Sequence, residues 1–348
     1  MNKVLIQDRI ISNNNEPYII AELSANHNGD LQRAFDSILA AKNSGADAVK
    51  IQTYTADTIT IKSDREEFKV KGGLWSGYDL YSLYKEAETP YEWHKDLFDY
   101  ANKIGITIFS SPFDHTAVDL LEELNSPAFK IASPEIIDLP LIARIAQAKK
   151  PIIISTGMAS LEEISEALET AKDNGCKDII LLHCISGYPT PPEQSNLMVI
   201  PDLIKKFNVL VGLSDHSMGT AVAVSSVALG ACVIEKHFTL SRTEKGPDSD
   251  FSMEPDEFKQ LCIDCKIASK SLGKVDYELK ESEKNGFKSR RSLYIVEDVK
   301  KGENFTLKNV RSIRPGLGLL PKHLDKVLQS KASQNIERGT PVSFDLIE

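Results

Sequence analysis

Two lysines stand inside apolar runs of this 348-residue chain, where a charged side chain is costly. Lys50 lies in the run VKIQT and Lys130 in the run FKIAS. An unpaired ammonium group in such surroundings would be strongly destabilising, so each lysine needs an anion. The anion is either a buried carboxylate, such as Glu22 or Glu135, or a substrate that carries a phosphate and a carboxylate. One of the lysines could also form a Schiff base with a carbonyl substrate.

Two histidines come directly after apolar runs, His216 in LSDHS and His237 in EKHF. If these runs are neighbouring strands, the two imidazoles can share one divalent metal and leave positions open for water and substrate. Two histidines alone are a weak metal signal, and both could instead be hydrogen-bonded core residues. Cys262 and Cys265 have C-x-x-C spacing but no second pair, so we expect them to pack in a core.

Composition excludes several other classes of protein. The net charge of -9 argues against binding to nucleic acid or to an anionic membrane surface. No P-loop and no G-x-G-x-x-G motif is present, which argues against nucleotide binding. An odd number of cysteines, five, fits a reducing compartment, and the chain shows neither a signal peptide nor an apolar span. We therefore expect a cytoplasmic protein.

The elements that would position these residues are eight short apolar runs separated by segments with helical spacing, such as 31–45, 93–105, 161–175 and 219–230. Alternation of strand and helix predicts a parallel sheet. Eight units favour a closed (β/α)8 TIM barrel over an open sheet. The predicted strands span residues 17–23, 47–53, 106–111, 128–133, 151–157, 178–184, 208–214 and 231–238.

Polar residues occupy the carboxyl ends of all eight predicted strands, which is where barrel enzymes place their active sites. Their number exceeds what turns require, so we interpret them as one site. They are Glu22, Asn26 and His27; Lys50 and Gln52; Ser110 and Ser111; Lys130, Ser133 and Glu135; Ser155 and Thr156; Ser186 and Tyr188; Ser214 and His216; and Lys236 and His237.

Two further segments depart from the alternation. The longest irregular insertion, residues 54–89, follows the second strand and is a candidate lid over the site. Beyond about Leu272 the pattern changes to a charged stretch and then short strands with glycine turns. We predict a catalytic domain over 1–271, a linker over 272–289 and a small mixed domain over 290–348.

Several motifs resemble the sialic acid synthase family, and the resemblance covers almost the entire chain. The motifs are IAELSANHNGD, GADAVKIQTY, FKIASPE, ISTGMAS, HCISGYPTPPE, VGLSDHS, IEKHFTL and GPDSDFSM. The tail, RRSLYIVEDVKKGENFTLKNVRSIRPGLGL, resembles the antifreeze-like (SAF) domain of that family. The segment KGGLWSGYDLYSLYKEAETPYEWH is most similar to its pseudaminic acid synthase branch, which uses 2,4-diacetamido-2,4,6-trideoxy-L-altrose as acceptor.

The resemblance implies a transferase that condenses phosphoenolpyruvate with an amino-sugar and releases phosphate by C–O cleavage. It implies a divalent metal, Mn²⁺ or else Mg²⁺ or Co²⁺, on His216 and His237, and a Glu22 carboxylate near C2 of phosphoenolpyruvate. Charge on the lysines would be matched by substrate rather than by protein. The substrate-binding residues it implies are Lys50, Lys130, Ser133, Ser155 and Ser214 for phosphoenolpyruvate, with Gln52, Ser110, Glu135, Ser186, Tyr188 and Asp248 completing the pocket.

Arg314 in SIRPG matches an arginine that the family's C-terminal domain inserts into the partner subunit's active site, so a domain-swapped homodimer is expected. Ser186 replaces an asparagine, and LSANH replaces the usual Gly-Ile-Asn-His run. These departures leave N-acetylmannosamine and the legionaminic acid precursor open as acceptors. The residues are also compatible with a Schiff-base aldolase and with a non-catalytic carbohydrate-binding protein.

Overall fold

The computed structural model describes residues 2–284 and 286–348 and separates into two compact units, Met1–Gly273 and Lys274–Glu348. The boundary falls directly after α10 (Pro255–Leu272). Assignment of residues 272–289 as a linker stays a prediction. Among the described residues, no helix is both long enough and apolar enough to cross a membrane.

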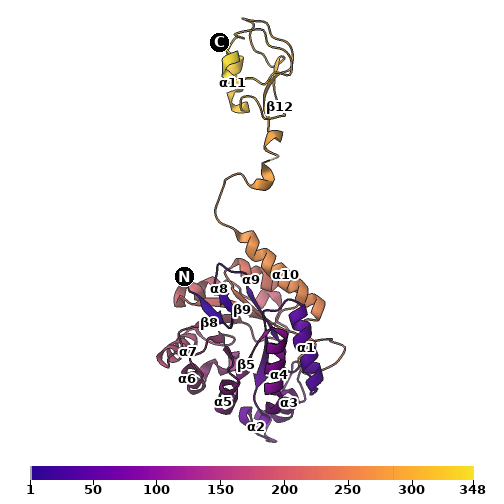
Figure 1. Ribbon diagram of the computed structural model, residues 1–348, viewed down its shortest axis with the longest axis vertical. Helices are drawn as coiled ribbons and strands as arrows, with labels where there is room; N and C mark the ends of the chain where they lie inside the picture. The colour runs from indigo at the N-terminus through magenta and orange to yellow at the C-terminus, as the bar shows by residue number, and fades with distance from the viewer. Residues whose placement is uncertain (1, 285) are drawn as a thin grey trace. The chain divides into compact units, whose positions relative to one another are not determined.

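The first unit is built on a closed parallel barrel, which confirms the predicted fold (Figure 1). All eight predicted strands form, and each neighbours the next along the chain, with the last pairing with the first. Register aligns the carboxyl ends, since His237 lies opposite Glu22 and Glu22 opposite Lys50. The strands are β3 (Tyr18–Glu22), β4 (Ala48–Thr53), β5 (Thr107–Pro112), β6 (Phe129–Ile131), β7 (Ile152–Ser155), β8 (Ile179–Cys184), β9 (Leu210–Asp215) and β10 (Val233–His237).

Helices surround the strands, and their ends carry ordinary capping signals. Asp30 caps the first barrel helix by accepting hydrogen bonds from two backbone N–H groups, Ser160 and Glu163 form a capping box, and Gly105 ends a helix at a φ of 75°. Apolar faces of these helices pack against the outer surface of the barrel. The helices are α1 (Leu31–Asn43), α4 (Tyr91–Ile104), α5 (His115–Glu123), α6 (Leu139–Gln147), α7 (Leu161–Asp173), α8 (Val199–Phe207), α9 (Ala221–Ala228) and α10.

A hairpin that sequence reasoning did not assign closes one end of the barrel. Strands β1 (Val4–Ile6) and β2 (Arg9–Ile11) pair antiparallel. Val4, Ile6 and Ile11 pack with the apolar side chains inside the barrel, among them residues at the amino ends of the strands. Among the described residues, the hairpin therefore covers the amino end of the barrel.

The insertion after β4 is more ordered than its irregular sequence indicated. It contains α2 (Ala56–Ile59), a 3₁₀ turn (Glu66–Phe68) and α3 (Leu80–Ala87), with a bridge between Lys69 and Asp79. Its place after the second barrel strand is the place the sequence predicted.

The second unit has a small core of its own. Strands β11 (Ser292–Ile295) and β12 (Val310–Ile313) pair antiparallel, and α11 (Leu324–Leu328) contributes Val327 to the core. Six further 3₁₀ turns occur in the described part of the chain, apart from the one in the insertion. They are Ser133–Ile137 and Pro192–Gln194 in the first unit, and Glu281–Glu283, Phe287–Ser289, Pro321–His323 and Phe344–Leu346 in the second.

Candidate active site

A cavity of about 500 Å³ opens at the carboxyl ends of the barrel strands. Its walls come from the strand ends, the insertion after β4 and the loop that carries Pro247 and Asp248. Most of the residues predicted to bind substrate line it. These are Glu22, Lys50, Gln52, Lys130, Ser133, Glu135, Ser155, Tyr188, Ser214, His216, His237 and Asp248.

Side-chain alternation excludes two of the strand-end residues from this cavity. On β10, Glu235 and His237 line the cavity, whereas Lys236 points the other way and pairs with Asp215 at 2.6 Å. Lys236 was predicted at the site from its strand-end position, and Glu235 was not. The alternation of side chains in VIEKH could have identified Glu235. Val233 packs inside the barrel, and Glu235 follows it by two residues on the same face of the strand.

The same rule applies to β5. Ser110 donates to the carbonyl oxygen of Ile51 at 3.0 Å and shares a hydrogen bond with Thr53 at 2.6 Å, so it lies behind the cavity wall. Ser111 accepts a hydrogen bond from Lys50 at 3.3 Å instead. Ser111 is therefore the β5 hydroxyl that belongs with the site, and Ser110 is a structural group.

The two predicted lysines pair with carboxylates of the protein, which corrects the expectation that substrate alone would match their charge. Lys50 Nζ lies 2.6 Å from Glu22 and 3.7 Å from Glu235, and Lys130 Nζ lies 3.5 Å from Glu235. Glu235 also accepts a hydrogen bond from Ser214 at 3.0 Å. The floor of the cavity is thus a buried network of two carboxylates and two lysines.

The charges in this network act on one another. Burial opposes ionisation of Lys50, but Glu22 and Glu235 outweigh it and raise the pKa of Lys50. Burial would also raise the pKa of Glu235, yet the ammonium groups of Lys130 and Lys50 hold it below its ordinary value. Burial raises the pKa of Glu22 and lowers the pKa of Lys130. The network thus shifts the pKa values of its two carboxyl groups in opposite directions, although both of them contact Lys50.

His216 and His237 lie together at the cavity wall, with ring centroids 5.3 Å apart. Nδ1 of His216 is 2.9 Å from the carbonyl oxygen of Ile185, which leaves Nε2 for another partner. Nδ1 of His237 is buried without a hydrogen-bond partner, and burial holds the pKa of His237 well below its ordinary value. A divalent metal requires a neutral imidazole with a free ring nitrogen, and His237 meets that condition. Burial opposes ionisation of His216, but its contact with Cys184 outweighs burial and raises the pKa of His216. No third His, Cys, Asp or Glu completes a ligand cluster among the described residues.

Behind the two histidines, a buried ion pair ties β9 to β10. Lys236 Nζ contacts Asp215 Oδ2 and the carbonyl oxygen of Ser217, each at 2.6 Å. Asp215 Oδ1 accepts from the backbone N–H of Ser217 at 2.9 Å. Because His216 lies between Asp215 and Ser217, and His237 follows Lys236, the ion pair fixes the backbone beside both imidazoles.

The hydroxyls of Ser133 and Ser186 lie against Gly157, and Ser155 lines the same cavity as Lys130. Ser133 Oγ accepts the backbone N–H of Gly157 at 3.0 Å, whereas the hydroxyls of Ser155 and Ser186 are buried without partners. A side chain at position 157 would collide with Ser133 and Ser186. A lysine, several hydroxyls and a glycine form a pocket suited to a phosphate.

Hydrogen bonds connect Glu22, predicted to lie near C2 of phosphoenolpyruvate, with Asp248, predicted to bind the sugar. Gln52 Nε2 donates to Glu22 at 3.3 Å and to Ser24 at 3.0 Å, and Ser24 donates to Asp248. The Tyr188 ring lies 4.3 Å from the His216 ring. Arg314 belongs to the second unit, where it is exposed directly after β12.

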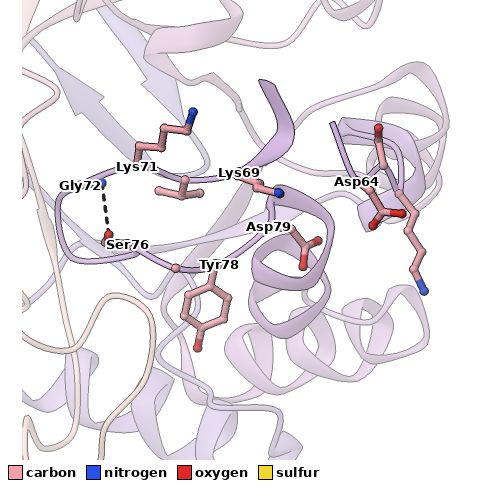
Figure 2. A pocket seen from close by; sticks show the side chains of 11 residues that line it. Asp64, Lys69, Lys71, Gly72, Ser76, Tyr78 and Asp79 are labelled. Carbon is pink, nitrogen blue, oxygen red and sulfur yellow. Dashed lines mark hydrogen bonds between the residues drawn. The ribbon is translucent and has the colours of Figure 1, made fainter. Parts of the chain in front are cut away.

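A second hollow, of about 610 Å³, lies within the insertion itself (Figure 2). It is lined by Lys69, Lys71 and Asp79, and the Gly72 N–H donates to Ser76 at 3.3 Å. None of the residues predicted for the active site lines this hollow.

Known proteins share both the sequence and the architecture of this chain. The sequence matches the NeuB family over residues 37–277 and the SAF domain over residues 290–348. It is 49% identical to a pseudaminic acid synthase of Campylobacter jejuni, over 92% of this chain and 94% of the relative. It is 45% identical to the Helicobacter pylori pseudaminic acid synthase, over 95% of this chain and 98% of the relative.

A solved structure is similar over most of the chain as well. The N-acetylneuraminic acid synthetase of Leptospira borgpetersenii, in complex with citrate, has a TM-score of 0.73 and 33% identity, and the match covers 82% of this chain and 95% of that one. The resemblance stated from the motifs is thereby confirmed. Since the family match spans more than half of the sequence, this chain belongs to the NeuB family.

Proposed function

We propose that this protein is a pseudaminic acid synthase, which joins phosphoenolpyruvate to 2,4-diacetamido-2,4,6-trideoxy-L-altrose. In the reaction, C3 of phosphoenolpyruvate forms a bond with the aldehyde carbon, water adds to C2, and the C2–O bond to phosphate breaks. The products are pseudaminic acid and inorganic phosphate. The observation that best supports this proposal is one cavity lined by two lysines, several hydroxyls and two histidines. The chain that forms it is 45–49% identical to pseudaminic acid synthases.

Phosphoenolpyruvate would occupy the floor of the cavity. Its phosphate would lie among Lys130, Ser133 and Ser155, where buried hydroxyls lack protein partners. Its carboxylate would meet Lys50 and Ser214. Both lysines already have a carboxylate neighbour in Glu235. Binding of phosphoenolpyruvate, a trianion, would therefore require the lysines to shift part of their pairing from Glu235 to the substrate.

The acceptor aldehyde would lie beside His216 and His237, which would hold a divalent metal. When bound, such an ion polarises a carbonyl oxygen as a Lewis acid, and Mn²⁺, Mg²⁺ and Co²⁺ are the candidates. The ion pair of Lys236 and Asp215 would keep the backbones of the two histidines in position.

Glu22 would act at C2 of phosphoenolpyruvate. Positive charge develops there as C3 attacks, and a carboxylate fixed at the floor stabilises that charge electrostatically. Gln52 orients Glu22 through its hydrogen bond, while Asp248 and Tyr188 would position the sugar. Neither C–C formation nor C–O cleavage needs a Schiff base at Lys130.

Arg314 would complete the site in a domain-swapped homodimer. Exposed apolar side chains on the loops after β6 to β9, Ile137, Met158, Met198 and Met218, fit a rim that a partner covers. The free, buried cysteines of the described residues fit a reducing compartment, so we place the protein in the cytoplasm.

The test measures phosphate release from phosphoenolpyruvate by the metal-loaded enzyme. The altrose acceptor and N-acetylmannosamine are offered separately, with a chelator control. Release with the altrose alone, and its loss on chelation, supports the proposal. Release only with N-acetylmannosamine contradicts the acceptor, and trapping of Lys130 by borohydride with pyruvate would instead indicate an aldolase.

A further inference from the structure

The cavity has two chemically different halves. Its floor, formed by the strand ends, is lined by charged and hydroxyl side chains such as Lys50, Lys130 and Glu235. Its roof comes from the insertion after β4 and is apolar or aromatic. The roof consists of Tyr54, Ile59, Val70, Trp75, Leu80, Leu83, Tyr84 and Ala87.

Helix α3 provides half of this roof. Leu80, Leu83, Tyr84 and Ala87 follow one another at spacings of three, one and three residues, which places them on one face of the helix. Such a stripe ordinarily packs against a protein core. Here it lines the cavity, so part of the apolar area is available to a ligand.

The roof offers a ligand few polar side-chain atoms. The indole N–H of Trp75 is already used, because it donates to the carbonyl oxygen of Pro247 at 2.8 Å. Only the hydroxyls of Tyr54 and Tyr84 remain. An acceptor hydroxyl pressed against Ile59 or Leu83 would therefore lose its water without gaining a partner.

Contacts within the insertion hold the roof in place. Glu88 accepts the backbone N–H of Ala56 at 2.8 Å, which joins the end of α3 to the start of α2. The Tyr54 ring packs on Phe113 with centroids 5.1 Å apart, and Trp75 packs on Tyr188 at 5.5 Å. The apolar surface is thus preorganised rather than formed by a loose loop.

We propose that this roof determines acceptor specificity by binding the deoxygenated C6 methyl group and an acetamido methyl of the sugar. The inference rests on the proposed function and extends it to the residues that choose the acceptor. The aldehyde end reacts at the charged floor, so the far end of the sugar must lie under the roof. A hydroxymethyl group in place of the methyl would be left without a hydrogen bond where it meets Ile59 or Leu83.

The test compares 2,4-diacetamido-2,4,6-trideoxy-L-altrose with its 6-hydroxy counterpart, measured as kcat/KM for phosphate release. We expect the wild-type enzyme to favour the 6-deoxy sugar by about 100-fold, the discrimination that an apolar pocket can exert against an added hydroxyl. In Ile59→Thr and Leu83→Thr we expect this ratio to fall about tenfold, because a hydroxyl in the roof supplies the missing partner. The KM for phosphoenolpyruvate should not change.

Ile61→Thr is the matched control. Ile61 belongs to the same insertion, is 60% exposed and does not line the cavity. The same substitution there should leave the ratio as in wild type. An unchanged ratio in both roof variants, or a wild-type enzyme that uses the two sugars equally, would overturn the inference. Absence of phosphate release with either sugar would refute the proposed function instead.

Discussion

Glu135 is a half-buried residue at the cavity wall, and its buried Oε2 atom lacks a hydrogen-bond partner. Burial raises its pKa from the ordinary 4.5 to about 7. A raised folded-state pKa means that the protonated form is the one the fold favours. Its contribution to stability is therefore complete below about pH 4.5 and is lost as the pH rises through about 7.

Glu135→Gln should remove this pH dependence. We expect the wild-type free energy of unfolding to fall by on the order of 2–3 kcal/mol between pH 5 and pH 8 on account of this group, and the variant to lack that decrease. Urea unfolding across the range measures it. Glu123→Gln, at an exposed helix end, is the control. Parallel curves for wild type and Glu135→Gln would contradict the assignment.

His237→Ala leaves one protein imidazole at the cavity wall. We expect it to abolish turnover and to weaken Mn²⁺ binding by at least about tenfold, since two ring nitrogens no longer converge on one ion. Titration calorimetry of the metal-free protein with Mn²⁺ measures the binding affinity independently of activity. His115→Ala, on the surface at the start of α5, should bind Mn²⁺ as wild type does. Full activity of His237→Ala in metal-free buffer would refute the metal site.

Residue identity alone predicted most of the groups that gather at the cavity and left their pairing open. Lys50 and Glu22 were recognised as a possible pair from their apolar surroundings, whereas Glu235 was missed. The choice between Ser110 and Ser111, or between Glu235 and Lys236, depends on which face of a strand points inward. The inward-facing side chains of a strand can be identified only when one of them, such as Phe109 or Val233, is known to lie inside the barrel.

At the scale of elements, the pair of Lys236 and Asp215 holds two strands at the point where they deliver the histidines. Both side chains are almost fully buried. Lys236→Met should cost about 3–5 kcal/mol of folding free energy, because Asp215 is left charged and unpaired in the interior. The double variant Lys236→Met/Asp215→Leu should recover part of that loss, as measured by urea unfolding.

The control for this pair is Lys206→Met, which breaks an exposed ion pair to Asp202 within α8. It should cost less than about 0.5 kcal/mol. The second measurement is the Mn²⁺ affinity of the stable double variant Lys236→Met/Asp215→Leu. If the ion pair only stabilised the fold, the double variant would bind Mn²⁺ as wild type does. We expect the affinity to be weaker than in wild type, and an unchanged affinity would show that the ion pair does not position the histidines.

Elements with strong periodicity were predicted well, and short ones were not. Continuous apolar runs with β-branched residues located all eight barrel strands. The hairpin of β1 and β2 escaped because each strand has three residues and the turn carries Gln7 and Asp8 rather than a glycine or asparagine pair. Helix α3 was included in an irregular insertion because its apolar stripe spans only two turns.

On the scale of the whole molecule, the count of strand–helix units was sufficient to predict closure, and closure in turn gathers the strand ends around one cavity. Sequence order cannot reveal that the hairpin closes the opposite end, because that depends on packing between segments far apart in the chain. It also cannot reveal which chain supplies Arg314. The arginine follows β12 in a separate unit, so its role has to be tested in the assembled protein.

Arg314→Ala should raise the KM for the amino-sugar far more than the KM for phosphoenolpyruvate, because the arginine is assigned to the acceptor end of the site. Steady-state kinetics with each substrate varied in turn measures both constants. The matched variant is Arg338→Ala, an exposed arginine of the same unit, which should leave both constants unchanged. An equal effect of Arg314→Ala on the two substrates would contradict its placement.

Co-expression of the Arg314→Ala and His237→Ala chains then decides which subunit the arginine serves. If Arg314 acts across the dimer, a mixed dimer contains one site with both groups intact and one with neither. Random pairing makes half of the dimers mixed, so about a quarter of wild-type activity should return at low acceptor concentration. If Arg314 serves its own chain, every site lacks one group, and mixing restores nothing. Recovery therefore requires a swapped dimer, because no other arrangement brings the two intact groups together.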